Sequence, residues 1–159
     1  MLFRSNVAAV TSQQAKLAGG PAIIGQVLLN PATDCDFSRP SYTENADGYV
    51  LTTALMHWFW DHYCDVDQRS DPKASPLRAP DLRGLPPAMI VTCEFDPLRD
   101  EGDAYARALA AAGVSVEHLQ AQGQTHTSTG AVDVLITPTA TREAMGNALR
   151  GMFGANVHA

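Results

Sequence analysis

The sequence has no long hydrophobic run. Its apolar stretches are the length of a strand, and the longest candidate, residues 104–116, is interrupted by Arg107. A membrane-spanning helix needs roughly 20 apolar residues, so no membrane span is expected. The first six residues also lack the extended apolar core of a signal peptide, and we therefore expect a cytoplasmic protein.

Cysteine is scarce, with three residues in the chain: Cys35, Cys64 and Cys93. None of their spacings is the short kind found in metal sites, and an odd number does not suit a disulfide scaffold. His57 and His62 are five positions apart, a spacing that does not place them on one helical face. We therefore expect free thiols and no metal site.

Positive charge is also low. Lys and Arg number 11 against 17 Asp and Glu, a net charge of −6 that would repel nucleic acid. Glycine-rich phosphate-binding patterns are missing, and so is the Gly-x-Ser-x-Gly motif that carries a nucleophile. Apolar residues, in contrast, make up 45% of the 159 positions, which is enough to build the core of one domain.

Strand-like and helix-like segments alternate along the chain. Ser5 or Asn6 is expected to cap the first helix, and Thr52 or Thr53 the second. Alternating strands and helices predict an α/β fold with a parallel sheet. The predicted order is helix 6–18, strand 23–29, helix 49–63, strand 88–93, helix 96–112, strand 114–119 and helix 138–152, with loops at 31–48, 64–87 and 120–130.

Asp96 and His126 each follow one of two neighbouring predicted strands and are 30 positions apart. The carboxyl ends of parallel strands meet at one edge of the sheet, so the two side chains are expected to lie side by side. A carboxylate beside an imidazole orients the ring and stabilises its charged form, as in a nucleophile–base–acid triad. The spacing also fits a simpler interpretation, in which Asp96 caps a helix and His126 is an ordinary loop histidine.

The predicted helix 49–63 holds both tryptophans of the chain. Trp58, Phe59 and Trp60 could line an apolar acyl or ligand pocket. Three consecutive aromatic side chains on a helix could equally pack in the core. The pattern leaves both interpretations open.

Asp100, Glu101 and Asp103 form an acidic cluster near the start of the predicted helix 96–112. Such a cluster resembles a carboxylate site. Negative charge in a first helical turn also interacts favourably with the helix dipole. We therefore interpret these residues as solvated helix charge.

The acid segment of the chain resembles a known family. The run Val91–Gly102 (VTCEFDPLRDEG), preceded by Leu85–Ala88 (LPPA), is similar to the acid segment of bacterial hormone-sensitive-lipase-like carboxylesterases, which are α/β-hydrolases. The resemblance covers about residues 5–153. Further similar segments are 21–31, 49–63, 75–77 and 105–114.

The resemblance implies a serine carboxylesterase that hydrolyses short to medium acyl esters. It assigns Asp96 as the acid and His126 as the general base of a catalytic triad. It also places Trp58, Phe59 and Trp60 on the acyl side of the substrate pocket. No metal ion or organic cofactor is implied, and the expected partner is a small-molecule ester.

The same resemblance implies part of an α/β-hydrolase fold. We expect three parallel strands with flanking helices, and part of a helical cap within about residues 31–87. In the family the histidine is commonly followed by Gly and an aromatic residue. Here Thr127 and Ser128 follow His126, so a different pocket wall is expected.

The nucleophile segment of the family has no counterpart in the chain. The family places Gly-Asp-Ser-Ala-Gly-Gly directly before the first predicted helix, where this chain has residues 1–5, and the nucleophile position falls at about Leu2. The His-Gly-Gly-Gly oxyanion-hole motif is also missing. We therefore expect residues 1–159 to be the C-terminal portion of one hydrolase domain, with little or no activity alone. A weaker alternative is that Ser5 or Ser128 acts as nucleophile.

The missing half has a structural consequence. In the complete fold the strand 23–29 would pair with a strand that this sequence lacks. An unpaired apolar edge invites pairing with another chain, so we expect a homo-oligomer through this edge, or aggregation. The alternative function is accordingly a non-catalytic fragment that acts as an oligomerising or interaction module.

Overall fold

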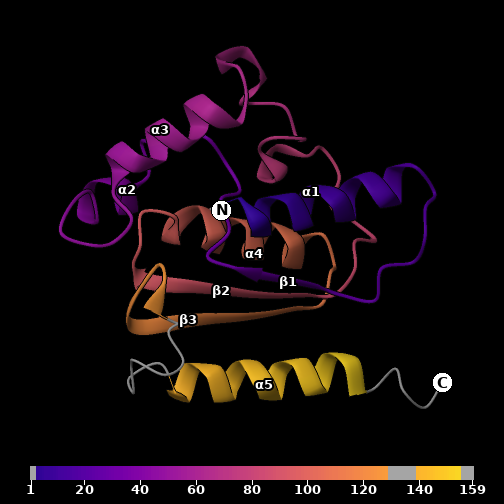
Figure 1. The fold of residues 1–159 in the computed structure, drawn as a ribbon. Helices are drawn as coiled ribbons and strands as arrows, with labels where there is room; N and C mark the ends of the chain where they lie inside the picture. Colours follow the sequence, from indigo (N-terminus) through magenta and orange to yellow (C-terminus); the bar gives the residue numbers. More distant parts are fainter. Residues whose placement is uncertain (1–2, 129–138, 155–159) are drawn as a thin grey trace.

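The computed structural model describes residues 3–128 and 139–154 of the chain, and its strands and helices alternate as predicted (Figure 1). The helices and strands are α1 (Arg4–Leu17), β1 (Gln26–Leu29), α2 (Pro40–Glu44), α3 (Thr53–Tyr63), β2 (Ala88–Phe95), α4 (Arg99–Ala111), β3 (Val116–Thr125) and α5 (Thr139–Gly154). Two short 3-10 turns lie at Val66–Gln68 and Pro76–Arg78. The predicted α/β class is confirmed.

The three strands form one parallel sheet in the order β1-β2-β3. β2 lies in the centre, and its first six residues, Ala88–Cys93, are all buried. A central parallel strand is covered on both faces, which explains why this run is almost entirely apolar. The three parallel strands expected of a partial α/β-hydrolase fold are therefore observed.

Helices cover both faces of the sheet: α1 and α4 lie on one side and α5 on the other (Figure 1). Leu28 and Ile90 belong to a buried cluster with Tyr105 of α4. Met89 belongs to a second cluster, against which Met145 of α5 packs. Successive side chains of a strand point to opposite faces, so β2 supplies Ile90 to one layer and Met89 to the other.

The helices α2 and α3 lie beyond α1 and α4, away from the sheet (Figure 1). They have a core of their own, in which Tyr42, Met56 and Trp60 are buried with Leu98. These residues fall mainly within the segment expected to form part of a helical cap. That assignment stays a prediction.

The predicted helix caps have different outcomes. α1 has Phe3 at its N-cap position and no capping side chain, so the prediction that Ser5 or Asn6 caps it is wrong. The physical reason is that α1 begins at Arg4, so Ser5 and Asn6 lie inside its first turn and their side chains bond to other segments. Thr52 does cap α3, because its hydroxyl accepts a hydrogen bond from the Leu55 main-chain N–H at 3.1 Å.

Several element boundaries differ from the prediction. β1 is limited to four residues, whereas β3 extends to Thr125 and includes the start of the predicted loop 120–130. That part of β3 is polar, which an edge strand tolerates because one side faces solvent. The predicted polar loop 31–48 contains α2, which begins with Pro40, a residue favoured in the first helical turn.

The glycines predicted to end helices do so. Gly19 follows α1 with φ 59°, and Gly113 follows α4 with φ 80°. These left-handed conformations cost glycine little, because it has no Cβ. The predicted start of the last helix, Pro138, lies outside the described residues.

Candidate active site

Asp96 and His126 lie together at the carboxyl edge of the sheet. Asp96 directly follows β2, and His126 directly follows β3. His126 Nδ1 is 2.7 Å from Asp96 Oδ2. The expectation that the two loops emerge side by side is met by this geometry.

The Asp96 carboxylate has two partners and is almost fully buried, with 1% of its side chain exposed. One oxygen, Oδ1, accepts a hydrogen bond from the Leu98 main-chain N–H at 2.9 Å and so holds the turn that leads into α4. The other oxygen, Oδ2, faces His126. Asp96 does not cap α4: Leu98 occupies the N-cap position, and no side chain caps the helix. The Asp96 carboxylate instead contacts both the turn before α4 and the His126 ring.

The His126 ring is held through one nitrogen. When Nδ1–H donates to the carboxylate of Asp96, the neutral ring keeps its lone pair on Nε2. An imidazole in this tautomer can accept a proton at Nε2, and the buried carboxylate stabilises the imidazolium that results. The arrangement can therefore perform general acid–base chemistry.

Neither candidate serine lies against His126. Ser5 Oγ donates to the Leu29 main-chain oxygen at 2.8 Å and accepts from the Leu29 N–H at 3.0 Å. Ser128 Oγ donates to Gln124 Oε1 at 2.7 Å. Both hydroxyls are thus bound to other groups, and the geometry gives no support to either as nucleophile. Leu2, the aligned nucleophile position, lies outside the described residues.

The three predicted substrate-binding aromatics do not share one surface. Trp60 is fully buried in the core of α2 and α3 and packs edge-on against Phe3, with ring centroids 5.2 Å apart. Trp58 is 53% exposed, and Phe59 is partly buried. Consecutive helical side chains point in different directions, which explains the separation. A role for these residues in binding the acyl group stays a prediction.

Glu101 is a buried group whose environment the sequence analysis missed. We interpreted it as solvated helix charge, and this is wrong for Glu101, which is fully buried in the first turn of α4. Its carboxylate accepts from the Thr33 N–H at 2.7 Å and from the Tyr42 hydroxyl at 3.0 Å. Burial raises the pKa of Glu101 to about 8, although these hydrogen bonds oppose the rise. Nothing in the local sequence distinguishes it from exposed Glu residues.

The described residues hold no candidate metal site, no membrane-spanning helix and no disulfide bond. Within residues 3–128 and 139–154, no group of three or more His, Cys, Asp and Glu side chains could hold a metal ion. No helix in the same part of the chain is long and apolar enough to cross a membrane. The cysteines Cys35, Cys64 and Cys93 are free thiols.

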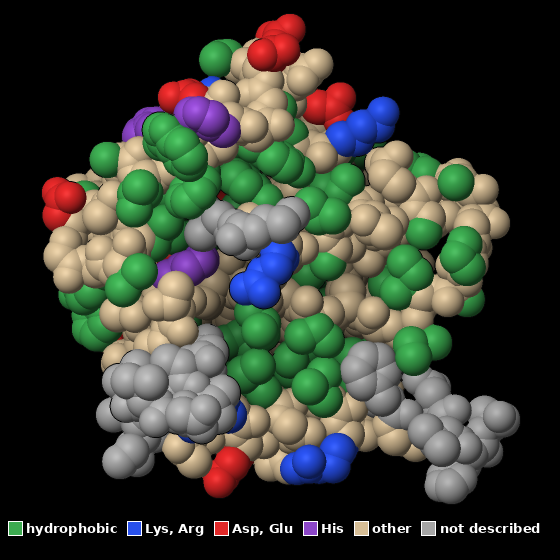
Figure 2. Space-filling model, viewed as in Figure 1, with side chains coloured by type: hydrophobic (Ala, Val, Ile, Leu, Met, Phe, Trp, Pro, Cys, Tyr) green, Lys and Arg blue, Asp and Glu red, His purple; other side chains and the backbone are tan. Residues whose placement is uncertain are grey.

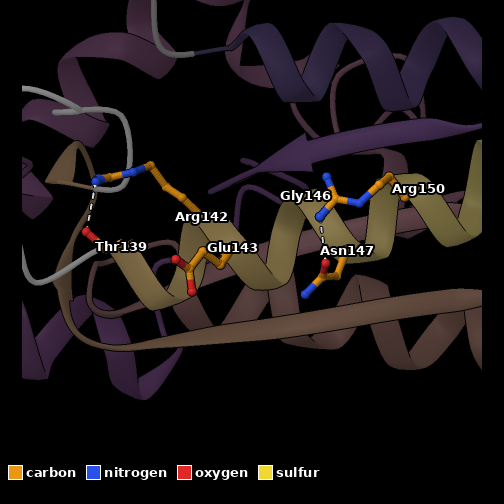
Figure 3. A pocket seen from close by; sticks show the side chains of 6 residues that line it. All are labelled: Thr139, Arg142, Glu143, Gly146, Asn147 and Arg150. Atoms are coloured by element: carbon orange, nitrogen blue, oxygen red, sulfur yellow. Dashed lines mark hydrogen bonds between the residues drawn. The ribbon is translucent and has the colours of Figure 1, made fainter.

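A shallow hollow on α5 contains neither Asp96 nor His126 (Figure 3). Its lining comes from α5 alone. Two arginines lie on the same side of the helix and bond to neighbours: Arg142 to the Thr139 hydroxyl at 3.2 Å and Arg150 to Asn147 Oδ1 at 2.6 Å. The hollow is therefore unrelated to the Asp96–His126 pair.

Comparisons with known proteins identify the family of the chain. Residues 5–129 match the family described as alpha/beta hydrolase fold. Carboxylesterase NlhH of Mycobacterium tuberculosis is 42% identical to this chain over 151 residues, which are 92% of this chain and 46% of that protein. A solved thermostable esterase of Pseudomonas putida is 47% identical, with a TM-score of 0.78 over 93% of this chain and 46% of its own.

A fungal esterase of Rhizomucor miehei is 38% identical and has a TM-score of 0.90, over 97% of this chain and 49% of its own. The chain thus spans about half the length, or less, of the curated relatives it matches. The matched range contains both Asp96 and His126, and Asp96 lies in the segment that carries the resemblance. On these grounds the chain belongs to the α/β-hydrolase fold family, as a hormone-sensitive-lipase-like member whose relatives are carboxylesterases.

Proposed function

We propose that this chain supplies the acid and the base of a serine carboxylesterase, and that the nucleophile belongs to a segment outside it. The observation that carries the proposal is the 2.7 Å contact between His126 Nδ1 and the buried Asp96 carboxylate. The esterase activity of the relatives supports the same reaction class. By family resemblance the substrates are short to medium acyl esters.

The proposed mechanism follows from the orientation of the ring. His126 Nε2 takes the proton of a serine hydroxyl as the serine oxygen attacks the ester carbonyl, and Asp96 stabilises the imidazolium. The ring then gives that proton to the departing alcohol. In the second half of the reaction the ring takes a proton from water as the water oxygen attacks the acyl carbonyl. It then gives that proton to the serine oxygen as the acyl–serine bond breaks, which releases the carboxylic acid and regenerates the serine. Without the serine no acyl-enzyme forms, so we propose that the chain alone is inactive.

A fusion protein tests this proposal. The segment of the Mycobacterium tuberculosis carboxylesterase that precedes the matched region would be joined to this chain, and hydrolysis of p-nitrophenyl butyrate measured. We expect activity in the fusion and none in the chain alone. Asp96→Asn and His126→Ala should each reduce kcat by at least about a thousandfold, because triad members act as a unit.

His62→Ala provides a matched control, since His62 bonds the Trp58 carbonyl on α3 and does not contact Asp96. It should leave the rate of the fusion unchanged. A folded but inactive fusion would contradict the proposal. Activity of the chain alone that disappears with His126→Ala would also contradict it, because a nucleophile would then exist within the chain.

A second candidate function is a non-catalytic oligomerising module. Hydrophobic side chains gather between α1 and α5 on the face shown in Figure 2. Leu29 at the end of β1 is 41% exposed, and Val27 of β1 and Leu149 of α5 are partly buried. We propose that a second copy of the chain covers this region. Sedimentation of the chain at several concentrations tests self-association, and an exclusively 17 kDa species would contradict it.

A further inference from the structure

Asn30 has an unusual backbone conformation at the end of β1. It is the one residue other than glycine, among those described, with a positive φ, at 44°. Asparagine tolerates this left-handed region better than most residues. Its main-chain N–H donates to the Val91 carbonyl at 2.8 Å and so continues the pairing with β2. The backbone at Asn30 therefore turns sharply just where β1 ends.

The turn directs the Asn30 side chain to the loop that follows β3. The Asn30 Nδ2–H donates a hydrogen bond to the main-chain carbonyl of His126. β1 and β3 are not neighbours, because β2 lies between them. The side chain thus crosses the end of the central strand and ties the first strand to the loop that carries the imidazole.

The other atoms of the Asn30 amide indicate that this contact is specific. The side chain is buried, and its Oδ1 has no hydrogen-bond partner within residues 3–128 and 139–154. Burying an unpaired oxygen lowers the free energy of unfolding. A contribution to the stability of the fold therefore does not explain why an asparagine is at position 30. Burial raises the pKa of the Cys93 thiol to about 12, and a hydrogen bond with the Asn30 side chain opposes this rise.

His126 is held at two points as a result. Its ring is fixed by Asp96 and its main chain by Asn30. The loop after β3 leaves the sheet at Thr125, so the strand ladder no longer restrains the His126 backbone. The Asn30 hydrogen bond thus gives His126 a second anchor, in addition to the carboxylate that follows β2.

We propose that Asn30 is a positioning residue that fixes the His126 main chain so that its imidazole stays bound to Asp96. The relevance to catalysis rests on the proposed function, whereas the positioning itself does not. Asn30 acts through His126 and is not assigned any contact with substrate. The prediction is that removing the Asn30 amide loosens the His126 ring without unfolding the chain.

The test uses the 159-residue chain and NMR of its imidazole protons. Asn30→Gly removes the amide but retains the left-handed backbone without strain, whereas Asn30→Ala adds strain at φ 44°. We expect the His126 Nδ1–H of the parent to be a downfield resonance that exchanges slowly with water. A net hydrogen bond contributes about 1 kcal/mol, so Asn30→Gly should speed this exchange by about fivefold to tenfold.

Gln13→Ala is the matched control. Gln13 is also a buried amide, and its Nε2 donates to the Pro76 carbonyl at 2.9 Å and to the Tyr105 hydroxyl at 3.1 Å. This variant should lower the thermal midpoint without changing exchange at His126. Equal exchange in the parent and in a folded Asn30→Gly would overturn the proposal, and so would the absence of a protected Nδ1–H in the parent. This experiment does not measure esterase activity. A failure of the proposed function would appear in the fusion experiment and not here.

Discussion

Ser5 and Leu29 exchange two hydrogen bonds, one from the Ser5 hydroxyl to the Leu29 carbonyl and one from the Leu29 N–H to Ser5 Oγ. Gln26 and Asn30 donate their main-chain N–H groups to carbonyls of Pro87 and Val91, next to or within β2. The main-chain N–H and C=O groups of successive strand residues point to opposite sides, so those of Leu29 point away from β2. The Ser5 side chain therefore occupies the place that a neighbouring strand would take, and the open edge of β1 is shorter than the sequence predicted.

Ser5→Ala should destabilise the chain and increase its self-association. Two main-chain groups of Leu29 would lose their partner, at a cost of about 1–2 kcal/mol. The same groups would become available for pairing with another chain. Urea unfolding and sedimentation velocity would measure the two effects. Ser38→Ala is a suitable control, because the Ser38 hydroxyl bonds Asp36 on an exposed loop. An unchanged sedimentation profile would contradict the prediction that Ser5 protects the edge of β1 from pairing with another chain.

Glu101 should make the stability of the chain depend on pH. The pKa of this buried carboxyl is raised from 4.5 to about 8, so the folded state binds the proton more tightly than the unfolded chain. The stabilisation is complete below about pH 4.5 and is lost as the pH rises towards 8, a difference of about 5 kcal/mol in the free energy of unfolding. Glu101→Gln should flatten this part of the profile, as measured by urea unfolding at intervals from pH 5 to 8.

The control for Glu101 is Glu143→Gln, which changes an exposed residue of α5. Its stability profile should follow that of the parent. If Glu101→Gln and the parent had parallel profiles, the pH dependence would have another source. Tyr42→Phe should be destabilising at neutral pH, because it removes the hydroxyl that donates to Glu101.

Asn6 should be among the most sensitive residues of α1. Its Nδ2 donates to the carbonyls of Ala32 at 2.9 Å and Ala74 at 2.7 Å, and its Oδ1 accepts from the Tyr63 hydroxyl at 2.7 Å. Asn6→Ala would leave these buried groups unpaired, at a cost of about 3 kcal/mol. Chemical denaturation measures the loss. Thr11→Ala, at an exposed position of the same helix, should change stability by less than about 0.5 kcal/mol.

Gly102 in α4 is required for close packing on β2. A Cβ at this position would lie 2.7 Å from Thr92 Cγ2, too close for a real contact. Gly102→Ala should therefore cost about 1–3 kcal/mol, even though alanine favours helices. Gly151→Ala in α5 meets no atom within 4 Å and should stabilise by up to about 1 kcal/mol. Thermal unfolding of both variants measures the two effects. A shift of the midpoint in the same direction for both variants would contradict the prediction.

Local sequence patterns predict the order of the main strands and helices. The continuous apolar run of β2, the stops at Gly19 and Gly113, and the cap at Thr52 are local signals that the structure reproduces. They work because backbone propensity and side-chain periodicity depend on near neighbours. The segment around Asp96 likewise identified the family, because a motif of that length is specific.

Tertiary structure alone decided what the individual polar and aromatic side chains do. Ser5 and Asn6 are both good helix-capping residues, yet α1 begins at Arg4, so both lie inside its first turn and each bonds to a distant segment instead. Glu101 is buried beside Tyr42 of α2, and Trp60 of α3 is buried in a cluster with Phe3 and Leu98. Burial and hydrogen-bond partners come from residues far apart in the chain, so no local pattern specifies them.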